Sequence, residues 1–270
     1  MKLTVLTDNH TLIDQYYVGE PALSFYLEDG RQRILFDTGY SDTVLRNAQA
    51  MGIDLSKLNA IVLSHGHNDH TRGLTYLWDS VDLSGVRLIA HPLVFARRRH
   101  QNLEVGAPFT KEECEAHGLI VEDGSKPVAL TKHLTFLGSI PRTVSFEAKE
   151  PIGKTKSGRQ WEPDYVQDDS ALVYEGDDGL FVVTGCSHSG ICNILTYAET
   201  LKPGKKISGV IGGFHLLEDN EQLAKTITFL KRHTEGTLYP CHCVSLAAKH
   251  RMMQKLPVEE VGVGMRIQVR

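Results

Sequence analysis

The chain has 270 residues and a formal net charge of −4 at pH 7, with 41% hydrophobic and 23% charged residues. This length can bury the core of one or two domains, and the composition is ordinary for a globular protein. The negative charge argues against nucleic acid as the main partner, because nucleic-acid binding usually leaves a basic footprint.

The amino-terminal segment MKLTVLTDNH is followed by no apolar run long enough for a signal-peptide core or a membrane span. We therefore expect a cytoplasmic protein without membrane contact. The cysteines do not resemble a disulfide scaffold, because their number is odd and they are spread along a long chain. A special role for any of them is expected to be metal-related or catalytic; they are Cys114, Cys186, Cys192, Cys241 and Cys243.

The first half of the chain predicts four short strands and one helix. Strands are expected at Leu3 to Leu6, Ala22 to Leu27, Arg33 to Phe36 and Asn59 to Leu63. The segment Ile34-Leu35-Phe36 is apolar throughout, so both of its faces should be covered. After Asp37-Thr38-Gly39, Ser41 or Asp42 is expected to cap a helix that runs to about Met51.

The middle of the chain, about residues 97–166, is expected to be an irregular insertion. Thr110 is a candidate cap for a short helix, and Gly153 to Gly158 is expected to be a mobile loop. Two basic clusters fall here: Arg97-Arg98-Arg99-His100, and Lys154, Lys156 and Arg159. Such clusters are usually solvated faces, but here they could also steer an anionic substrate.

The second half repeats the pattern of strands before helices. Strands are expected at Leu172 to Tyr174, Leu180 to Val183, Ile207 to Ile211 and Thr237 to Tyr239. Helices are expected around Ile191 to Ala198, Leu223 to Leu230 and Leu246 to Leu256. The tail, Val258 to Val269, is expected to form a strand pair. Two such halves predict two sheets packed face to face with helices outside, a four-layer αββα sandwich. We expect one domain over residues 1–270, interrupted by the insertion.

The strongest chemical signal is the run His65-Gly66-His67-Asn68-Asp69-His70, directly after the apolar strand that ends at Ser64. Two histidines at positions i and i+2 of a tight loop can bind one metal ion, while Asp69 and His70 can reach a second position nearby. Imidazole and carboxylate together suit Zn²⁺ and related ions. A histidine-rich surface loop is the bland alternative, but such loops seldom follow a buried strand in this way.

This run resembles the metal-binding signature of the metallo-β-lactamase superfamily. Phe36-Asp37-Thr38-Gly39 is similar to the early Asp motif of that superfamily, and Tyr239-Pro240-Cys241-His242 to its late His motif. The resemblance implies that His242 is a metal ligand and that Asp37 orients the ligand loop. It also implies a divalent metal cofactor: Zn²⁺, as one or two ions, with Mn²⁺ or Fe²⁺ as other candidates.

Two further segments resemble one subgroup of the superfamily, which is related to 7,8-dihydropterin-6-methyl-4-(β-D-ribofuranosyl)aminobenzene-5′-phosphate synthase. They are Thr184-Gly185-Cys186-Ser187-His188-Ser189-Gly190 and Gly212-Gly213-Phe214-His215-Leu216. The late motif of the subgroup usually reads Cys-His-Cys-Thr-Gly, and here it ends in Val244-Ser245. The exact substrate can therefore differ from that of the subgroup.

The resemblance also shows where this chain departs from the common dinuclear site. Cys186 stands where most of the superfamily has a metal-bridging Asp, so it is either a ligand or a small buried residue. His188 is expected to be a ligand of the first metal ion. Asp168 and Asp169 stand near the usual middle His and could supply a carboxylate instead. The site could hold one tightly bound and one weakly bound ion.

Two more features of this region have open roles. His215 ends an apolar strand and could contact the substrate, bind metal or be structural. The turn from Gly185 to Gly190 leads from a strand into a helix, so its N–H groups could hold a phosphate. A tight turn that simply uses glycine is an equally good interpretation.

These observations predict a metal-dependent hydrolase acting on a small, anionic substrate that contains phosphate or a pterin. A metal-bound hydroxide would attack the substrate, with Asp69 and Asp37 as the catalytic carboxylates. A synthase-like reaction would instead use the metal to assist the departure of diphosphate. The alternative from another class is a metal- or ligand-sensing protein without turnover. The sequence does not indicate an oligomeric state.

Overall fold

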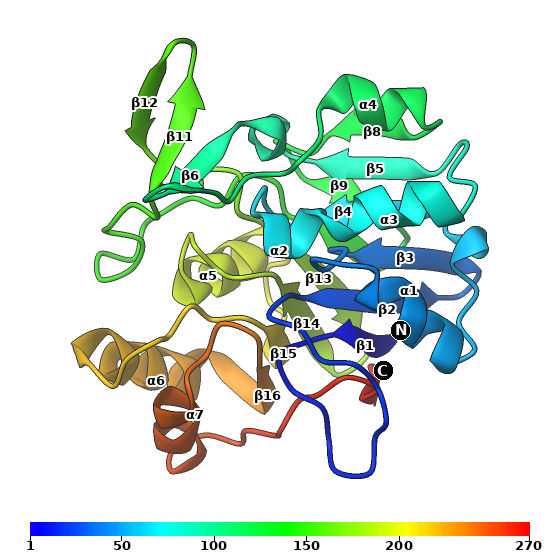
Figure 1. The fold of residues 1–270 in the computed structure, drawn as a ribbon. Helices are drawn as coiled ribbons and strands as arrows, with labels where there is room; N and C mark the ends of the chain where they lie inside the picture. Colours follow the sequence, from blue (N-terminus) through cyan, green and yellow to red (C-terminus); the bar gives the residue numbers. More distant parts are fainter.

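The computed structural model describes residues 1–270, and two β-sheets packed face to face form its centre (Figure 1). The first sheet has seven strands in the order β17 (Arg266–Gln268), β1 (Lys2–Thr7), β2 (Ser24–Asp29), β3 (Gln32–Phe36), β4 (Ala60–Leu63), β5 (Arg87–Ala90) and β8 (Ile120–Asp123). The second has six in the order β16 (Thr234–Pro240), β15 (Ile207–Gly212), β14 (Gly179–Thr184), β13 (Ala171–Gly176), β10 (Leu134–Phe136) and β9 (Val128–Ala129).

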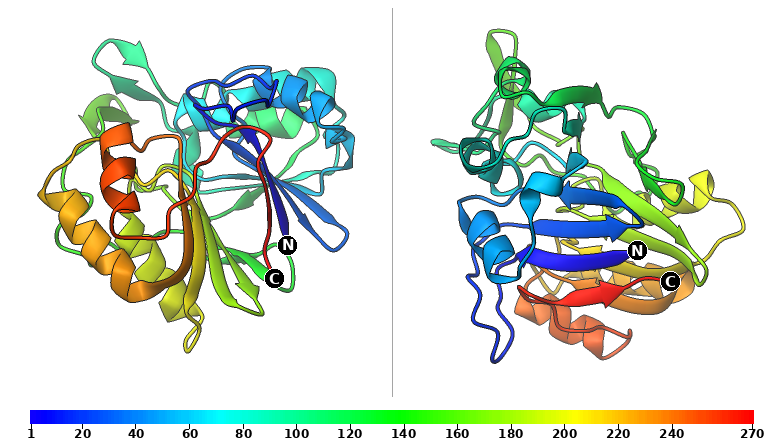
Figure 2. Two further views of the ribbon diagram at one scale, coloured as in Figure 1. Left: turned by 90° about the horizontal axis from the view of Figure 1, so that it is seen from below. Right: turned by 90° about the vertical axis from the view of Figure 1, so that its right-hand side faces the viewer.

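Helices cover the outer face of each sheet, which Figure 2 shows from two further sides. Those packed on the first sheet are α1 (Thr43–Ala50), α3 (Gly73–Ser80) and α4 (Lys111–Ala116). Those packed on the second are α5 (Ile191–Leu201), α6 (Glu221–His233) and α7 (Leu246–Met253). The predicted αββα sandwich is thereby confirmed.

Alternation of apolar side chains explains why the layers form. In β4 all residues are buried, and they divide between the two faces of the strand. Ala60 and Val62 join the core between the sheets, whereas Ile61 and Leu63 pack under the helices of the first sheet. Because successive side chains of a strand point to opposite faces, a strand without polar residues has to be covered on both.

The insertion is more ordered than we expected. It forms a third, four-stranded sheet, here called the arm, which stands above the sandwich in Figure 1. Its strands are β12 (Gln160–Pro163), β11 (Lys154–Ser157), β6 (Arg98–His100) and β7 (Leu103–Glu104). The prediction of a mobile loop at 153–158 is wrong, because Lys154 to Ser157 pair with Gln160 to Pro163 as a hairpin. Gly158 lies in the turn of this hairpin with a φ of 55°, a left-handed conformation that glycine adopts without steric penalty.

The carboxyl-terminal tail also differs from the prediction of a strand pair. Only β17 is a strand, and it pairs antiparallel with β1. Residues 258 and 263 make isolated bridges to Leu238 and Thr11 instead. The polar residues Glu259 and Glu260 are exposed at this point, so the segment has no continuous apolar face to bury.

No helix of this structure combines the length and the apolar character that crossing a bilayer requires.

Parallel strand pairs bring the chemically interesting loops to one edge of the sandwich. Strand β3 pairs parallel with β4, and β15 pairs parallel with both β14 and β16. The carboxyl ends of parallel neighbours lie at the same edge of a sheet, where α/β folds commonly place their ligands. The loops that follow β4, β14 and β16 carry the candidate ligands.

Candidate metal centre

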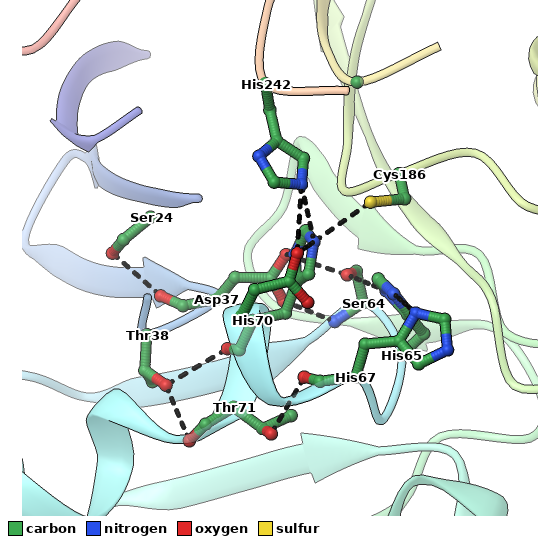
Figure 3. A network of polar contacts seen from close by, with 12 residues as sticks. Ser24, Asp37, Thr38, Ser64, His65, His67, His70, Thr71, Cys186 and His242 are labelled. Atoms are coloured by element: carbon green, nitrogen blue, oxygen red, sulfur yellow. Dashed lines mark hydrogen bonds and ion pairs between the residues drawn. The ribbon is translucent and has the colours of Figure 1, made fainter. Parts of the chain in front are cut away.

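Three loops from distant parts of the chain meet at this edge, as Figure 3 shows. The loop after β4 carries the histidine run and continues into the single turn α2 (Asn68–Thr71). The loop after β14 brings Cys186 and His188, and the loop after β16 brings His242. The spatial convergence on which the metal-site hypothesis depends is present in the structure.

One group of possible ligands consists of Asp69, His70, Cys186 and His242, whose ligand atoms all lie within 4.8 Å of one another. His70 Nε2 lies 3.0 Å from Cys186 Sγ and 3.2 Å from His242 Nε2. Asp69 Oδ2 lies 3.3 Å from His242 Nε2 and 3.7 Å from His70 Nε2. Two imidazoles, a thiol and a carboxylate therefore point at a common position.

A second group consists of His65, Cys186 and His188, again with all ligand atoms within 4.8 Å. His67 adjoins this group, because its Nδ1 lies 3.0 Å from His65 Nε2 and its ring packs 4.8 Å from that of His188. Cys186 belongs to both groups. It occupies the place between them that a bridging ligand would need.

Several nitrogen atoms in these groups have no hydrogen-bond partner in the protein, which leaves them available to bind a divalent cation. His188 Nδ1 and Nε2 and His67 Nε2 are buried without any hydrogen-bond partner. Buried polar atoms normally have partners, so unpaired ones indicate that something is bound there. A set of imidazole, thiolate and carboxylate ligands suits Zn²⁺ in particular.

The electrostatics of the cluster also suit a cation. Burial, reinforced by the neighbouring histidines, holds the pKa of His65 and of His188 well below the ordinary value. Burial likewise lowers the pKa of His67 to about 4. These rings are therefore neutral near pH 7, which is the form that binds metal. Burial opposes charge on His70 as well, but Asp69 and Asp37 raise its pKa to about 9.

Asp37 supports the ligand loop from behind. Its carboxylate accepts hydrogen bonds from Ser64 N and Ser64 Oγ, both at 2.7 Å, and contacts His70 Nδ1 at 2.7 Å. These contacts leave Nε2 of His70 directed toward Cys186 and His242 (Figure 3). A carboxylate behind a ligating histidine orients the ring and increases its basicity.

The loop directly after β1 supplies two supporting residues that the sequence analysis missed. Asp8 Oδ1 accepts a hydrogen bond from His242 N at 2.9 Å, and Asn9 Oδ1 lies 2.9 Å from His242 Nδ1. His242 therefore uses Nδ1 for Asn9 and leaves Nε2 for the cluster. Asp8 and Asn9 belong to no motif around the histidines, so only their position at the end of β1 could have identified them.

The carboxylates of Asp168 and Asp169 have other partners and join neither ligand group. Asp168 accepts from Gly66 N at 2.8 Å and from Arg98 Nη2 at 2.5 Å. Asp169 accepts from the backbone N–H of Ser189 at 2.8 Å. Both carboxylates thus hold the ligand loops in place. A ligand role for either carboxylate, which the resemblance left open, stays a prediction.

His215 lies beside the cluster. Its ring packs 4.6 Å from that of His188, and the residue is partly exposed. It belongs to neither ligand group. Its role, which the sequence left open between substrate contact, metal binding and a structural function, stays a prediction.

The turn from Gly185 to Gly190 is not free to bind phosphate. The carboxylate of Glu147 occupies the first turn of α5, where it accepts from Cys192 N at 3.0 Å and from Asn193 N at 2.9 Å. A Cβ atom on Gly190 would lie 2.2 Å from Glu147 Oε2, so the carboxylate is packed directly against this turn. The chain thus provides its own anion at this helix amino terminus.

A hollow of about 440 Å³ opens beside the cluster. His67 and Asp69 form part of its lining, together with Tyr40, Asn68 and His100. The Asp69 side chain is 30% exposed, so a molecule in the hollow could reach it. His100 belongs to the arm, which therefore forms one wall of the approach.

Comparisons with known proteins agree with this geometry. The sequence model of the metallo-beta-lactamase superfamily matches residues 17–202. A protein of Methanocaldococcus jannaschii, named 7,8-dihydropterin-6-methyl-4-(beta-D-ribofuranosyl)-aminobenzene-5′-phosphate synthase, is 30% identical over 94% of this chain and 91% of its own length. An uncharacterized protein of the same organism is 30% identical over 93% of this chain and 94% of its own length.

Solved structures show the same fold. The crystal structure of Tm1679, described as a metal-dependent hydrolase of the beta-lactamase superfamily, matches with a TM-score of 0.85 and 28% identity, covering 100% of this chain and 99% of that one. Zn²⁺-bound PqqB from Methylobacterium extorquens matches with a TM-score of 0.59 and 12% identity, covering 99% and 100%. At that identity the second likeness concerns the fold alone.

Proposed function

The chain belongs to the metallo-β-lactamase superfamily, and on that premise we propose that it is a metal-dependent enzyme acting on a small, anionic substrate that contains phosphate or a pterin. One observation carries the proposal: seven side chains from three loops direct metal-ligating atoms into one buried cluster beside an open hollow. In a purely structural cluster the buried nitrogens of His188 and His67 would be expected to have hydrogen-bond partners, and these have none.

We assign the ligands to two adjoining positions. His65, His67 and His188 would hold one cation, and Asp69, His70 and His242 would hold the other, with Cys186 between them. Zn²⁺ is the first candidate, because thiolate and imidazole favour it over Mn²⁺, and Fe²⁺ is the second. A cation held there would act as a Lewis acid toward water and toward a substrate oxygen.

The residues of the chain would then orient the ligands and contact the substrate. Asp69 is the only carboxylate of the ligand groups and reaches the hollow, so we assign its second oxygen, Oδ1, to accept a hydrogen bond from a water or substrate group there. Asp37 keeps His70 in the orientation that this chemistry needs. We assign His215, whose ring packs 4.6 Å from that of His188, to contact the substrate.

Two reaction types use the same site. Hydrolysis of an ester or phosphoester is supported by the description of Tm1679 as a metal-dependent hydrolase. Group transfer with departure of diphosphate is supported by the name of the synthase that is 30% identical to this chain. The alternative of another class, a metal- or ligand-sensing protein, is supported by Cys186, because a thiol at the shared position tightens binding of a soft metal.

The test combines metal analysis with turnover. Purified protein would be analysed for bound metals by plasma mass spectrometry and then assayed with phosphodiester, lactone and dihydropterin diphosphate substrates. We expect one or two equivalents of metal and turnover that chelation abolishes and Zn²⁺ restores. Metal bound without turnover of any substrate favours the sensing protein, and absence of stoichiometric metal contradicts both proposals. His133→Ala, far in sequence from the ligand loops, serves as the control against His188→Ala.

A further inference from the structure

A second hollow, of about 530 Å³, adjoins the one beside the metal cluster. The two share Tyr40 and Asn68 in their linings. Phe95 and Phe109 form an apolar part of the second hollow, and their rings pack 6.3 Å apart. A molecule whose reacting bond lies at Asp69 can therefore extend past Tyr40 into a partly aromatic space.

Arg72 is the cation of this second hollow that has no anionic partner. Two other arginines line it, and each is already paired: Arg97 lies 2.6 Å from Glu104, and Arg98 contacts two aspartates. Arg72 makes no ion pair and its side chain makes no hydrogen bond, although the residue is partly buried. A guanidinium in this situation keeps its donors available for a ligand.

Contacts within the protein hold Arg72 in position before any ligand binds. Its guanidinium lies 4.5 Å from the centre of the Tyr40 ring, an arrangement that occupies its face and leaves the edge N–H groups free. The backbone is fixed as well, because Gly73 N donates to Gly39 O at 3.0 Å and Thr38 N donates to His70 O at 2.8 Å. These backbone hydrogen bonds join the segment that carries Arg72 to the segment that carries Tyr40.

We propose that Arg72, supported by Tyr40, binds an oxyanion group of the substrate, while Phe95 and Phe109 contact an apolar or aromatic part of it. The shared chemistry is a carboxylate or phosphate, which the planar guanidinium can bind through two parallel N–H donors. This inference rests on the proposed function only where it identifies the bound molecule as the substrate. The binding itself is measured independently of turnover.

The binding experiment uses small probes on the purified protein. Calorimetric titrations with phenyl phosphate, benzoate and benzyl alcohol would be compared for the wild type, Arg72→Gln and the matched control Arg97→Gln. We expect Arg72→Gln to weaken binding of the preferred anion by about tenfold, as loss of a charge-assisted hydrogen bond does. Benzyl alcohol should be unaffected, and the two anions distinguish phosphate from carboxylate recognition.

A second variant keeps the proposal open to contradiction if Arg72→Gln disturbs the nearby ligand loop and loses metal. Phe109→Leu lies outside that loop and should weaken phenyl phosphate while leaving inorganic phosphate unchanged. The proposal is overturned if Arg97→Gln loses as much affinity as Arg72→Gln, or if neither Arg72→Gln nor Phe109→Leu alters binding of phenyl phosphate.

Kinetics separate this inference from the proposed function. For a substrate that the wild type turns over, Arg72→Gln should raise KM about tenfold and change kcat much less, because the contact is remote from the reacting bond. Turnover that is independent of Arg72 contradicts the inference and leaves the proposed function standing. Binding that depends on Arg72 without any turnover contradicts the proposed function and leaves the oxyanion site standing.

Discussion

Four non-glycine residues around the candidate metal centre have a positive φ: Asp37 at 57°, Ser187 at 59°, His215 at 48° and His242 at 51°. Such conformations are unfavourable for residues with a Cβ and gather at functional sites, where surrounding contacts maintain them. Here the contacts are visible, since the Asp37 carboxylate makes three hydrogen bonds with Ser64 and His70, and His242 is hydrogen-bonded to Asp8 and Asn9. The strained backbone at Asp37 and His242 helps hold these two side chains in the contacts named above.

Replacing Asp37 tests whether one of its carboxylate oxygens, Oδ2, supports the ligand loop. In Asp37→Asn the amide keeps one acceptor, but it can no longer accept from both Ser64 Oγ and His70 Nδ1 through the second oxygen. We expect metal affinity to fall by about 10- to 100-fold, which is typical for loss of a residue that orients a ligand. Competition with a chelator measures it, and Asp177→Asn, an exposed aspartate, should leave the affinity unchanged.

Cys186 offers a spectroscopic test of the ligand assignment. Because its Sγ belongs to both ligand groups, protein loaded with Co²⁺ should show a near-ultraviolet absorption band from thiolate-to-metal charge transfer. Cys186→Ala should lose that band, while Cys192→Ala, a buried cysteine of α5, should retain it. A band that survives in Cys186→Ala would show that this thiol does not bind the metal.

At the scale of elements, the alternation of side chains in β6 connects the arm to the ligand loop. Arg98 points inward and is 2% exposed, with Asp164 at 2.9 Å and Asp168 at 2.5 Å. Its neighbour Arg99 points outward and lies 4.3 Å from the centre of the Trp161 ring. The basic cluster, which the sequence analysis interpreted as a solvated face or as a patch that steers an anionic substrate, therefore contains one buried structural cation, Arg98, between the surface cations Arg97 and Arg99.

This division predicts a large difference between adjacent substitutions. Arg98→Met leaves two buried carboxylates without their cation and should lower the free energy of unfolding by about 3–5 kcal/mol. Arg99→Met removes a surface cation–π contact and should lower it by about 1 kcal/mol or less. Urea unfolding of the two variants measures both values. Similar losses in the two variants would contradict the buried role of Arg98.

The junction between Glu147 and α5 predicts a pH dependence. Burial raises the pKa of Glu147 above its ordinary value near 4.5, against the lowering effect of the Cys192 and Asn193 N–H groups. Between the ordinary and the raised pKa the folded protein keeps a proton that the unfolded chain has released. The contribution of Glu147 to the free energy of unfolding therefore falls as pH rises through that window.

Urea unfolding from pH 4 upward should detect this effect as a difference between two proteins. The stability of the wild type relative to Glu147→Gln should decline with rising pH and then level off, because the amide does not titrate. Glu150→Gln, close in sequence but exposed, provides the matched control. A relative stability that instead rises with pH would show that the N–H groups of α5 outweigh burial.

Sequence patterns predicted the layers well and the irregular parts poorly. Apolar runs such as Ile34 to Phe36 and Ile207 to Ile211 identify strands because both faces are buried. The arm hairpin was taken for a loop because Lys154, Lys156 and Gly158 suit exposed turns as well as exposed strands. In the site, motif residues were found from their spacing, whereas Asp8, Asn9 and Arg98 act through contacts that no spacing encodes.

At the scale of the whole molecule, the cluster joins the two halves of the sandwich. His65 to His70 follow a strand of the first sheet, and Cys186, His188 and His242 follow strands of the second. Binding of a cation to the folded form alone should therefore stabilise the whole sandwich, by about 2.7 kcal/mol at a free concentration of 100 times Kd.

Thermal unfolding with and without chelator tests this coupling. We expect the midpoint of the wild type to fall when the metal is removed, and the midpoint of His188→Ala to change less, because one donor is already missing. The control His133→Ala should behave as the wild type does. Equal chelator sensitivity of His188→Ala and the wild type would contradict a role of His188 in binding.

The distance along the chain between His70 and His242, 172 residues, also bears on biosynthesis. At the usual rates of translation a ribosome needs roughly 10 to 30 s to add that many residues. During this interval the nascent polypeptide displays the early histidines without the donor that completes the site. Under the proposed ligand assignment, the position that needs His242 would stay incomplete until nearly all of the sandwich has been synthesised, which would limit loss of metal to unfinished chains.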